Sequence, residues 1–538
     1  MTPLRIATVA LTLSFVAVAG CSHKQAGQPT DNIFHDFMTA SPTTFDPAMV
    51  QDGTTIDLLQ NIFEGLVQWT PDNKVAPALA TDWTISKDGL TYTFHIRKNV
   101  TFQDGQPVTA QDVYYSMRRA LDPSLNSPVA LNYLGDIVGS DDVRNGKTHD
   151  LKGVKVIDPY TVAITIKKPK AYWIYTLTYP TAYVVSKKEA DAATGPMTDA
   201  QLAPGAGTGP FKLDHYDKDQ DVELTANPAY WQGAPKIAGQ DRLIVLDAGT
   251  RHALYVSGKL DIVDEQTDAL DADLNNPALK DQVKFFPRAS TFYIGLNEKA
   301  FPPFKNVLVR QAFAYATDKQ KIRDVVFNGK VDIAQDILPE GIPGFDPAFK
   351  GLPYDPAKAQ MLLSQAGYPG GKGLPTLPVY YREGYPQLDQ TVDLLRVMWS
   401  QNLGVTIDPR KTEWATLLAK EDSNSLECYH IRWAADYLDQ QDYYSVLLRT
   451  GSSENHTSYS NAQYDALCDA ADISQDPAKR SAMYRKAARI VADEVPLIPL
   501  YYQQDTELVK PYVTHLDDGL MGHLPYNNLV LTHGASGQ

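Results

Sequence analysis

The chain has 538 residues, of which 43% are hydrophobic and 21% are charged; this composition excludes a disordered protein and predicts two or three folded domains. Its formal net charge of −15 opposes attraction to phosphate backbones and anionic lipid headgroups, so we expect no nucleic-acid partner. The only cysteines, Cys21, Cys428 and Cys468, exclude a disulfide framework, and their spacing leaves open whether the last two pair.

The N-terminal segment has the pattern of a secretory signal. Arg5 precedes an apolar stretch over residues 6–19, which is shorter than a membrane-spanning helix. The small residues directly before Cys21 resemble the lipobox of bacterial lipoproteins, in which the signal is removed and the cysteine is lipidated. We therefore expect a signal peptide over 1–20, a polar lipidated tether over 21–30 and lipidation at Cys21, with an ordinary structural cysteine as the alternative.

A strand and a helix follow each other closely after the tether. Apolar and polar residues alternate between Thr91 and Val100, which predicts a half-buried strand. Thr109 stands three residues before Asp112, a spacing that is typical of a helix N-terminus. We expect this helix to end before Pro123.

Strand and helix signals continue to alternate further along the chain. Alternation over 162–166 predicts another strand, and the segment from Asp355-Pro356 to Gly367 has the capping residue, first-turn proline and terminal glycine of a helix. The Gly/Pro-rich segment 367–378 is predicted to be a surface loop. This interleaving predicts a mixed α/β protein without a fixed-period repeat.

The sequence contains none of the common local signatures of hydrolase, zinc or thiol redox chemistry. The glycines between 205 and 210 have the wrong spacing for a dinucleotide site, and Gly371-Lys372-Gly373 lacks the Ser/Thr of a P-loop, so both segments are predicted to be turns. No two histidines lie three or four residues apart. We expect a protein that is not an enzyme and has no cofactor or metal site, with an extracytoplasmic hydrolase as the alternative.

A resemblance to a known family rests on motifs that occur in order over nearly the whole chain after the tether. The blocks are Phe45-Asp46-Pro47, Ile62–Leu66, Leu79–Trp83, Tyr92–Arg97, Phe102–Val113, Gly207–Phe211, Asn227–Trp231 and Val309–Asp318. They resemble the oligopeptide- and dipeptide-binding proteins, the family 5 extracytoplasmic solute-binding proteins of peptide-type ABC importers.

The resemblance implies an α/β, two-lobed fold of the periplasmic-binding-protein type (cluster C), which closes like a hinge over a cleft and carries an extra subdomain in its first lobe. The expected boundaries are 31–63, 190–290 and 505–538 for lobe I, 64–189 for the extra subdomain and 291–504 for lobe II.

The resemblance also places ligand chemistry in the segment Arg432–Tyr437. In oligopeptide-binding relatives an aspartate three residues after a tryptophan pairs with the peptide α-amino group, and Asp436 follows Trp433 in this way. A desolvated carboxylate there fixes the register of any unblocked peptide. The alternative interpretation of Asp436 is a surface or capping carboxylate.

Other residues complete the predicted site. Trp433 and Tyr437 are expected to wall side-chain pockets, with core packing as the alternative, and Ala435 lies between them in the same segment. His430 stands where some relatives carry an arginine. On the first lobe, the resemblance places Gln51 and Gly53 at peptide-facing positions.

The implied function is an extracytoplasmic, lipid-anchored monomer that captures short peptides and delivers them to an ABC permease, whose ATPase subunits supply the ATP chemistry. Its contact with the membrane is through the lipid alone, on the periplasmic side if the cell has two membranes. The alternatives are a non-peptide ligand within the same fold (a nickel chelate, haem, an opine or an oligosaccharide) and a chaperone or receptor that takes no part in transport.

Overall fold

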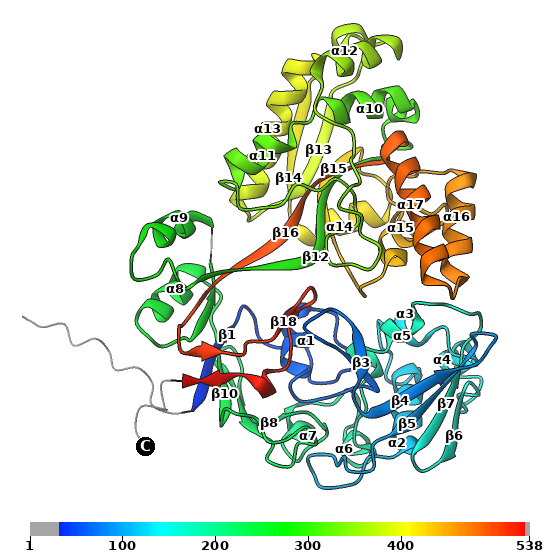
Figure 1. Ribbon diagram of the computed structural model, residues 1–538, viewed down its shortest axis with the longest axis vertical. Helices are drawn as coiled ribbons and strands as arrows, with labels where there is room; N and C mark the ends of the chain where they lie inside the picture. Colours follow the sequence, from blue (N-terminus) through cyan, green and yellow to red (C-terminus); the bar gives the residue numbers. More distant parts are fainter. Residues whose placement is uncertain (1–31, 266, 533–538) are drawn as a thin grey trace, which may run out of the picture.

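The computed structural model describes residues 32–265 and 267–532, so the predicted signal peptide, the tether and Cys21 lie outside the described residues. Helices and strands are interleaved along the chain. Figure 1 shows two bodies, one above the other, with the long strands β12 (Val283–Leu296) and β16 (Leu497–Val509) running between them. Within the described part, no helix combines the length and apolar character that a membrane crossing requires.

The lower body contains two separate four-stranded sheets. The first has the order β1 (Ile33–Met38), β10 (Gly239–Ile244), β9 (Asp221–Ala226), β8 (Phe211–Asp217). The second has the order β4 (Ala80–Ile85), β5 (Thr91–Ile96), β7 (Thr161–Thr165), β6 (Val154–Asp158). β1 and β10 are parallel, and the other pairs in both sheets are antiparallel.

The elements predicted around the second sheet are confirmed. β5 occupies the first part of the predicted strand, and β7 matches the alternating segment over 162–166. Helix α2 (Ala110–Leu121) begins at the predicted position, where Asp112 accepts a hydrogen bond of 2.9 Å from the backbone N–H of Thr109. The helix ends at Leu121, before Pro123, because proline has no backbone N–H to donate to the preceding turn of a helix.

The upper body is built on a six-stranded sheet into which both long strands enter. Its order is β11 (Ile262–Asp264), β16, β12, β15 (Cys428–Ala434), β13 (Leu377–Arg382), β14 (Ile407–Thr412). β12 and β16 pair over 283–287 with 504–508 and over 291–295 with 497–502, and the register shifts between Pro287 and Thr291. The pairing of these two strands, which run from one body to the other in Figure 1, is thus interrupted between Pro287 and Thr291.

Helices cover the sheets in both bodies (Figure 1). Those of the lower body are α1 (Gly53–Leu59), α2, α3 (Ala130–Leu134), α4 (Ser140–Arg144), α5 (Trp173–Thr176), α6 (Lys187–Ala192), α7 (Asp199–Leu202), α8 (Ala248–Val256) and α9 (Thr267–Asn275). Those of the upper body are α10 (Val307–Tyr315), α11 (Lys319–Val326), α12 (Pro356–Gln365), α13 (Pro386–Leu403), α14 (Trp414–Asp422), α15 (Gln440–Leu448), α16 (Ala462–Ile473) and α17 (Pro477–Glu494).

Short elements complete the chain. They are β2 (Val67–Trp69) with β3 (Val75–Pro77), β17 (Val513–Thr514) with β20 (Val530–Leu531), β18 (Asp518–Gly519) with β19 (Gly522–His523), and the 3₁₀ turns Pro180–Ala182, Pro302–Lys305, Pro369–Gly371 and Tyr526–Asn528. Each pair of short strands is antiparallel.

The predicted helix over 355–367 is α12. The carboxylate of Asp355 accepts a hydrogen bond of 2.9 Å from the backbone N–H of Lys358, and Pro356 takes the first helical position. Gly367 follows the helix with φ of 94°, a conformation that side chains disfavour. The predicted loop over 367–378 is shorter than expected, because β13 already begins at Leu377.

Several of the motif blocks meet at Glu64. This buried carboxylate accepts hydrogen bonds of 2.9 Å from Thr208 and 2.9 Å from Tyr230, and one of 3.0 Å from the indole N–H of Trp231. The guanidinium of Arg97 lies 4.1 Å from the centroid of the Trp231 ring. The blocks around residues 64, 97, 208 and 230 thus form one structural network in the lower body.

A second block is fixed by a buried ion pair. Asp46 is fully buried and accepts two hydrogen bonds, of 3.1 and 2.5 Å, from the guanidinium of Arg119 on α2. The same carboxylate accepts the backbone N–H of Met197 at 2.9 Å. In the upper body Cys428 and Cys468 are both buried and free, so the question of their pairing is answered: they do not form a disulfide.

Candidate functional site

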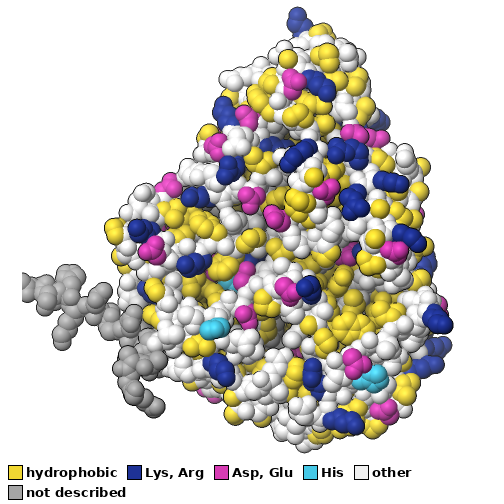
Figure 2. All heavy atoms as spheres, viewed as in Figure 1, with side chains coloured by type: hydrophobic (Ala, Val, Ile, Leu, Met, Phe, Trp, Pro, Cys, Tyr) yellow, Lys and Arg dark blue, Asp and Glu magenta, His cyan; other side chains and the backbone are white. Residues whose placement is uncertain are grey.

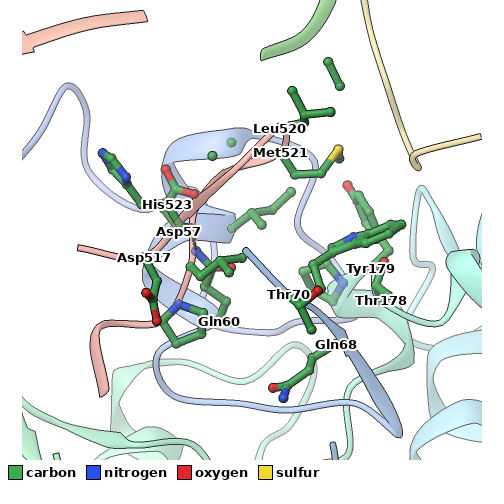
Figure 3. A pocket seen from close by; sticks show the side chains of 18 of the residues that line it. Asp57, Gln60, Gln68, Thr70, Thr178, Tyr179, Asp517, Leu520, Met521 and His523 are labelled. Carbon is green, nitrogen blue, oxygen red and sulfur yellow. Dashed lines mark hydrogen bonds between the residues drawn. The ribbon is translucent and has the colours of Figure 1, made fainter. Parts of the chain in front are cut away.

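A cavity of about 720 Å³ is lined by residues of both bodies. The lower body contributes the start of α1 and stretches within 63–71, 178–183 and 517–528, and the upper body contributes a stretch within 432–436. The long strands β12 and β16 contribute stretches within 288–290 and 503–507. In Figure 3, Asp57, Gln60, Asp517 and His523 lie on one side of the cavity, and Thr178 and Tyr179 lie on the other. The volume is in the range of cavities that hold small ligands.

Four of the predicted site residues meet in this cavity. Gln51 and Gly53 line it from the segment that leads into α1, and Ala435 and Asp436 line it from the loop after β15. The fold therefore brings the two parts of the predicted site together from opposite bodies.

The side chain of Asp436 is exposed to the cavity, and its backbone is fixed by a hydrogen bond to Asp442. Its N–H donates a hydrogen bond of 3.1 Å to Oδ2 of Asp442, and the indole N–H of Trp433 donates one of 3.1 Å to the same oxygen. The surrounding protein, and then the charge of Glu454, raises the pKa of Asp436 above its ordinary value. A cationic ligand group would counter both effects.

Trp433 does not line the cavity, which corrects the expectation that it walls a side-chain pocket. It is half-buried, and its indole positions Asp442, whose pKa burial raises well above the ordinary range, with the charge of Asp436 adding to the shift. Successive residues of a strand point to opposite faces, so Arg432 and Ala434 on β15 line the cavity while Trp433 points away.

Tyr437 also lies outside the cavity lining, which corrects the same expectation for this residue. Its side chain is buried, its hydroxyl donates to Gln441, and its ring lies parallel to that of Tyr172, with centroids 5.6 Å apart. Tyr172 precedes α5 in the lower body. Tyr437 therefore joins the two bodies beside the cavity.

His430 is only 1% exposed and does not line the cavity, which corrects its prediction as a ligand contact. It lies in the interior of β15, where its ring stacks on Phe292 with centroids 5.6 Å apart. Burial lowers the pKa of His430 to about 3, so the imidazole is neutral and gives the cavity no pH sensitivity.

The charged wall of the cavity was not found from the sequence. Arg288 lies 2.6 Å from Asp505 and 2.9 Å from Asp518, and His523 lies 2.9 Å from Glu507 and 2.9 Å from Asp518. Burial alone would lower the pKa of His523, but the two carboxylates outweigh it and raise the pKa to about 10. These residues come from three separate segments, and no local pattern marks them.

The balance of charge in the lining is negative. The acidic side chains are Asp57, Glu64, Asp436, Asp505, Glu507 and Asp517, against the basic side chains Arg288, Arg432 and His523. The surrounding protein raises the pKa of Asp57 and of Glu64 to about 7, so these two are only partly ionised at neutral pH. Such a lining favours ligands that carry positive charge. On the outer face seen in Figure 2, acidic and basic side chains are interspersed instead.

Among the described residues, the group that places three potential metal ligands together is His252, Glu265 and Asp273, whose ligand atoms lie within 4.8 Å of one another. None of the three lines the cavity. His252 already lies 2.7 Å from a carboxylate oxygen of Asp273.

Residues 74–455 match the family model described as bacterial extracellular solute-binding proteins, family 5, middle region. The chain is 30% identical to the probable deoxycholate-binding periplasmic protein of Escherichia coli (strain K12), over 88% of each chain. It is also 30% identical to the heme-binding protein A of Haemophilus influenzae, over 94% of this chain and 95% of that protein. The periplasmic oligopeptide-binding protein of Escherichia coli is 29% identical over 90% of this chain and 89% of its own length.

The fold has a counterpart among solved structures. The unliganded open form of the periplasmic murein tripeptide-binding protein superposes with a TM-score of 0.80 at 24% identity, covering 94% of this chain and 98% of that chain. The predicted two-lobed α/β fold is thus confirmed, with the lower body of Figure 1 holding the chain's N-terminal sheets and the upper body the six-stranded sheet.

Proposed function

The chain belongs to the family 5 bacterial extracellular solute-binding proteins, and from that premise we propose that it binds short peptides with a free N-terminus and delivers them to an ABC permease. It is an extracytoplasmic binding protein and not an enzyme. The observation that carries the peptide proposal is the carboxylate of Asp436, exposed in the cavity while its backbone is held by Asp442.

Every unblocked peptide carries one ammonium group at a fixed place relative to its backbone. An ion pair between that group and Asp436 sets the register of the ligand without reading a side chain. Main-chain groups at the rim of β15, which ends at Ala434, then meet the peptide backbone as an added strand would. Affinity in this arrangement comes from atoms that all peptides share.

The charge of the lining supports an amine-bearing ligand over the ligands named for two of the relatives. Deoxycholate carries a carboxylate and haem carries two, and the acidic groups of this cavity outnumber its basic ones. An anionic ligand would have to compete with Asp505 and Asp518 for Arg288. Arg432, whose guanidinium hydrogen-bonds Gln503, can meet the carboxylate of a peptide or of another ligand, so the preference for an amine rests on the acidic side chains.

We also propose the lipid anchor, the monomeric state and the lobe boundaries that the sequence predicts. Cys21 carries the lipid anchor, residues 21–30 form the tether, and the protein acts as a monomer. The lobe boundaries are 31–63, 190–290 and 505–538 for lobe I, 64–189 for the extra subdomain and 291–504 for lobe II. β12 and β16, which run between the two bodies, then form the hinge.

Calorimetric titration of the purified protein with four ligands tests the proposal: tri-alanine, N-acetyl-tri-alanine, deoxycholate and haemin. We expect tri-alanine to bind at least about tenfold more tightly than its acetylated form, since acetylation removes the charge that Asp436 meets. Equal affinities of the two peptides would remove Asp436 from the role of anchor. Binding of haemin or deoxycholate without peptide binding would assign the cavity to a non-peptide ligand.

A further inference from the structure

We propose that the lobe I wall of the cavity holds a second cation-binding position, formed by the carboxylate of Asp57, which selects peptides with a basic side chain. The inference rests on the proposed function, because it assigns a side-chain preference to the same cavity. The inference concerns Asp57 in the lower body and a ligand side chain, whereas the proposed function concerns Asp436 in the upper body and the α-amino group.

Helix α1 presents Asp57 to the cavity. The carboxylate of Asp52 caps the helix by accepting the backbone N–H of Thr55 at 2.8 Å, and Leu58 and Leu59 are fully buried beneath it. Asp57 lies on the opposite, exposed side and lines the cavity, where Figure 3 shows it beside Gln60. Its direction is thus fixed by the packing of its own helix.

The carboxylate of Asp57 has no partner of its own. Over residues 32–265 and 267–532, neither a hydrogen bond nor an ion pair involves its side-chain oxygens, whereas its backbone carbonyl accepts from the side-chain amide of Asn61 at 2.8 Å. The other acidic groups that line the cavity on this side are engaged. They are Glu64 with Thr208 and Tyr230, Asp505 with Arg288, Glu507 with His523, and Asp517 with Asn528 at 2.7 Å.

Two of the protein's own cations lie near Asp57 without bonding to it. His523 lies between Glu507 and Asp518, and Arg242 donates from Nε to Gln240 and lies 3.7 Å from Asp36. Asp57 is therefore a carboxyl group without a cation of its own. The surrounding protein raises its pKa to about 7, while Arg242 and His523 limit the shift, so a bound cation favours the ionised form of the group.

Closure of the cavity over a ligand would remove water from the Asp57 carboxylate. A carboxylate that loses water without gaining a cation or hydrogen-bond donor destabilises the closed state, so a ligand that brings neither binds less tightly. A lysine or arginine side chain supplies both, at a position in the opposite body from Asp436. A peptide with a free N-terminus and one basic side chain thus satisfies both exposed carboxylates at once.

The test compares matched peptides that differ by one charge. Tri-alanine is prepared with lysine at each of its positions in turn, and again with norleucine, which has the same carbon chain without the ammonium group. Affinities for the wild-type protein, Asp57→Asn, Asp57→Glu and Asp436→Asn are measured by calorimetry. The quantity of interest is the ratio of lysine-peptide to norleucine-peptide affinity at each position.

For the wild-type protein we expect a ratio of about tenfold or more at one position, the lower end for a hydrogen bond to a charged group. The ratio should fall to about one in Asp57→Asn and be restored in part in Asp57→Glu. Asp436→Asn should weaken both members of a pair and keep their ratio, because the two carboxylates meet different ligand groups.

Two results overturn the inference. A ratio near one at every position in the wild-type protein refutes the second cation position while the binding of tri-alanine upholds the proposed function. A high ratio that persists in Asp57→Asn assigns the selectivity to another group of the cavity. If none of the peptides binds the wild-type protein, the proposed function fails first, and the inference fails with it.

Discussion

The phenol ring of Tyr437 stacks on the ring of Tyr172 across the two bodies, with centroids 5.6 Å apart and planes 6° apart. The guanidinium of Arg480 lies 5.8 Å from the centroid of the same Tyr172 ring. An aromatic contact beside the cavity therefore joins the loop that carries Asp436 to the lower body.

Replacing Tyr437 with leucine should weaken peptide binding without touching the ligand. An aromatic pair contributes about 0.5 to 1.5 kcal/mol beyond its buried area, so we expect the affinity for tri-alanine to fall by up to about tenfold. Tyr437→Phe keeps the ring and loses only the hydroxyl that donates to Gln441, and should lose less. Calorimetry measures both, and equal losses in the two variants would show that the stack contributes nothing.

Asp436→Asn should act on one ligand group alone. Removing one partner of a buried charge pair costs about 2 to 5 kcal/mol, so tri-alanine should bind to this variant no better than N-acetyl-tri-alanine binds to the wild-type protein. Affinity for the acetylated peptide should change little. A parallel loss for both peptides would mean that the substitution disturbs the loop rather than the α-amino contact.

His523→Gln should lower stability in a pH-dependent way. The pKa of His523 is raised to about 10 in the folded protein, from an ordinary value of 6.5, so its stabilising contribution is complete below about pH 6.5 and is lost as the pH rises toward 10. In urea unfolding at pH 6, the free energy of unfolding of His523→Gln should be about 3 kcal/mol lower than that of the wild-type protein, the size expected when a buried ion pair is broken. The deficit should shrink by pH 9.5, and a constant deficit would contradict the ion-pair assignment.

Asp46→Ala should destabilise the lower body because it leaves the guanidinium of Arg119 without its carboxylate partner. Arg119 is only 8% exposed and would keep a buried charge without a carboxylate, at a cost of about 3 to 5 kcal/mol. Adding Arg119→Leu removes that charge, so the double variant should be more stable than Asp46→Ala alone. Thermal unfolding of the two single variants and the double variant completes the cycle, and simple additivity would show that the pair is not coupled.

The sequence predicts local structure well where one short segment decides the outcome. Thr109 and Asp112 satisfy each other across one helical turn, and Asp355 with Pro356 starts α12, so both helices could be placed from neighbouring residues alone. The strand expected over 91–100 ends early, at Ile96, because only this part pairs with strands on both sides.

The site was predicted only in part, and the errors have one cause. Asp436, Ala435, Gln51 and Gly53 line the cavity, and their contact with a ligand stays a prediction. The resemblance also places His430, Trp433 and Tyr437 in the site, but none of them lines the cavity. Trp433 points to the other face of β15, Tyr437 is buried against Tyr172, and His430 is covered by packing against Phe292. The orientation of a side chain at a strand end depends on pairing with distant strands, which a single segment does not reveal.

The acidic wall escaped prediction for a different reason. Asp57 lies hundreds of residues before Glu507 and His523, and the three meet only because the C-terminal segment folds back against α1, where Gln60 donates a hydrogen bond of 2.7 Å to the backbone carbonyl of His523. In the sequence, each of these residues taken alone has the pattern of an ordinary charged surface residue.

The position of β16 between β11 and β12 also means that the six-stranded sheet can form only after β16 has been synthesised. Because this interior strand lies near the C-terminus, the six-stranded sheet stays split until the last part of the polypeptide has emerged, and the carboxylates that face Arg288 and His523 arrive with it. A prematurely terminated translation product would lack the strand that unites its sheet and would stay open to envelope proteases. The topology thus makes an intact six-stranded sheet a property of chains that extend through β16.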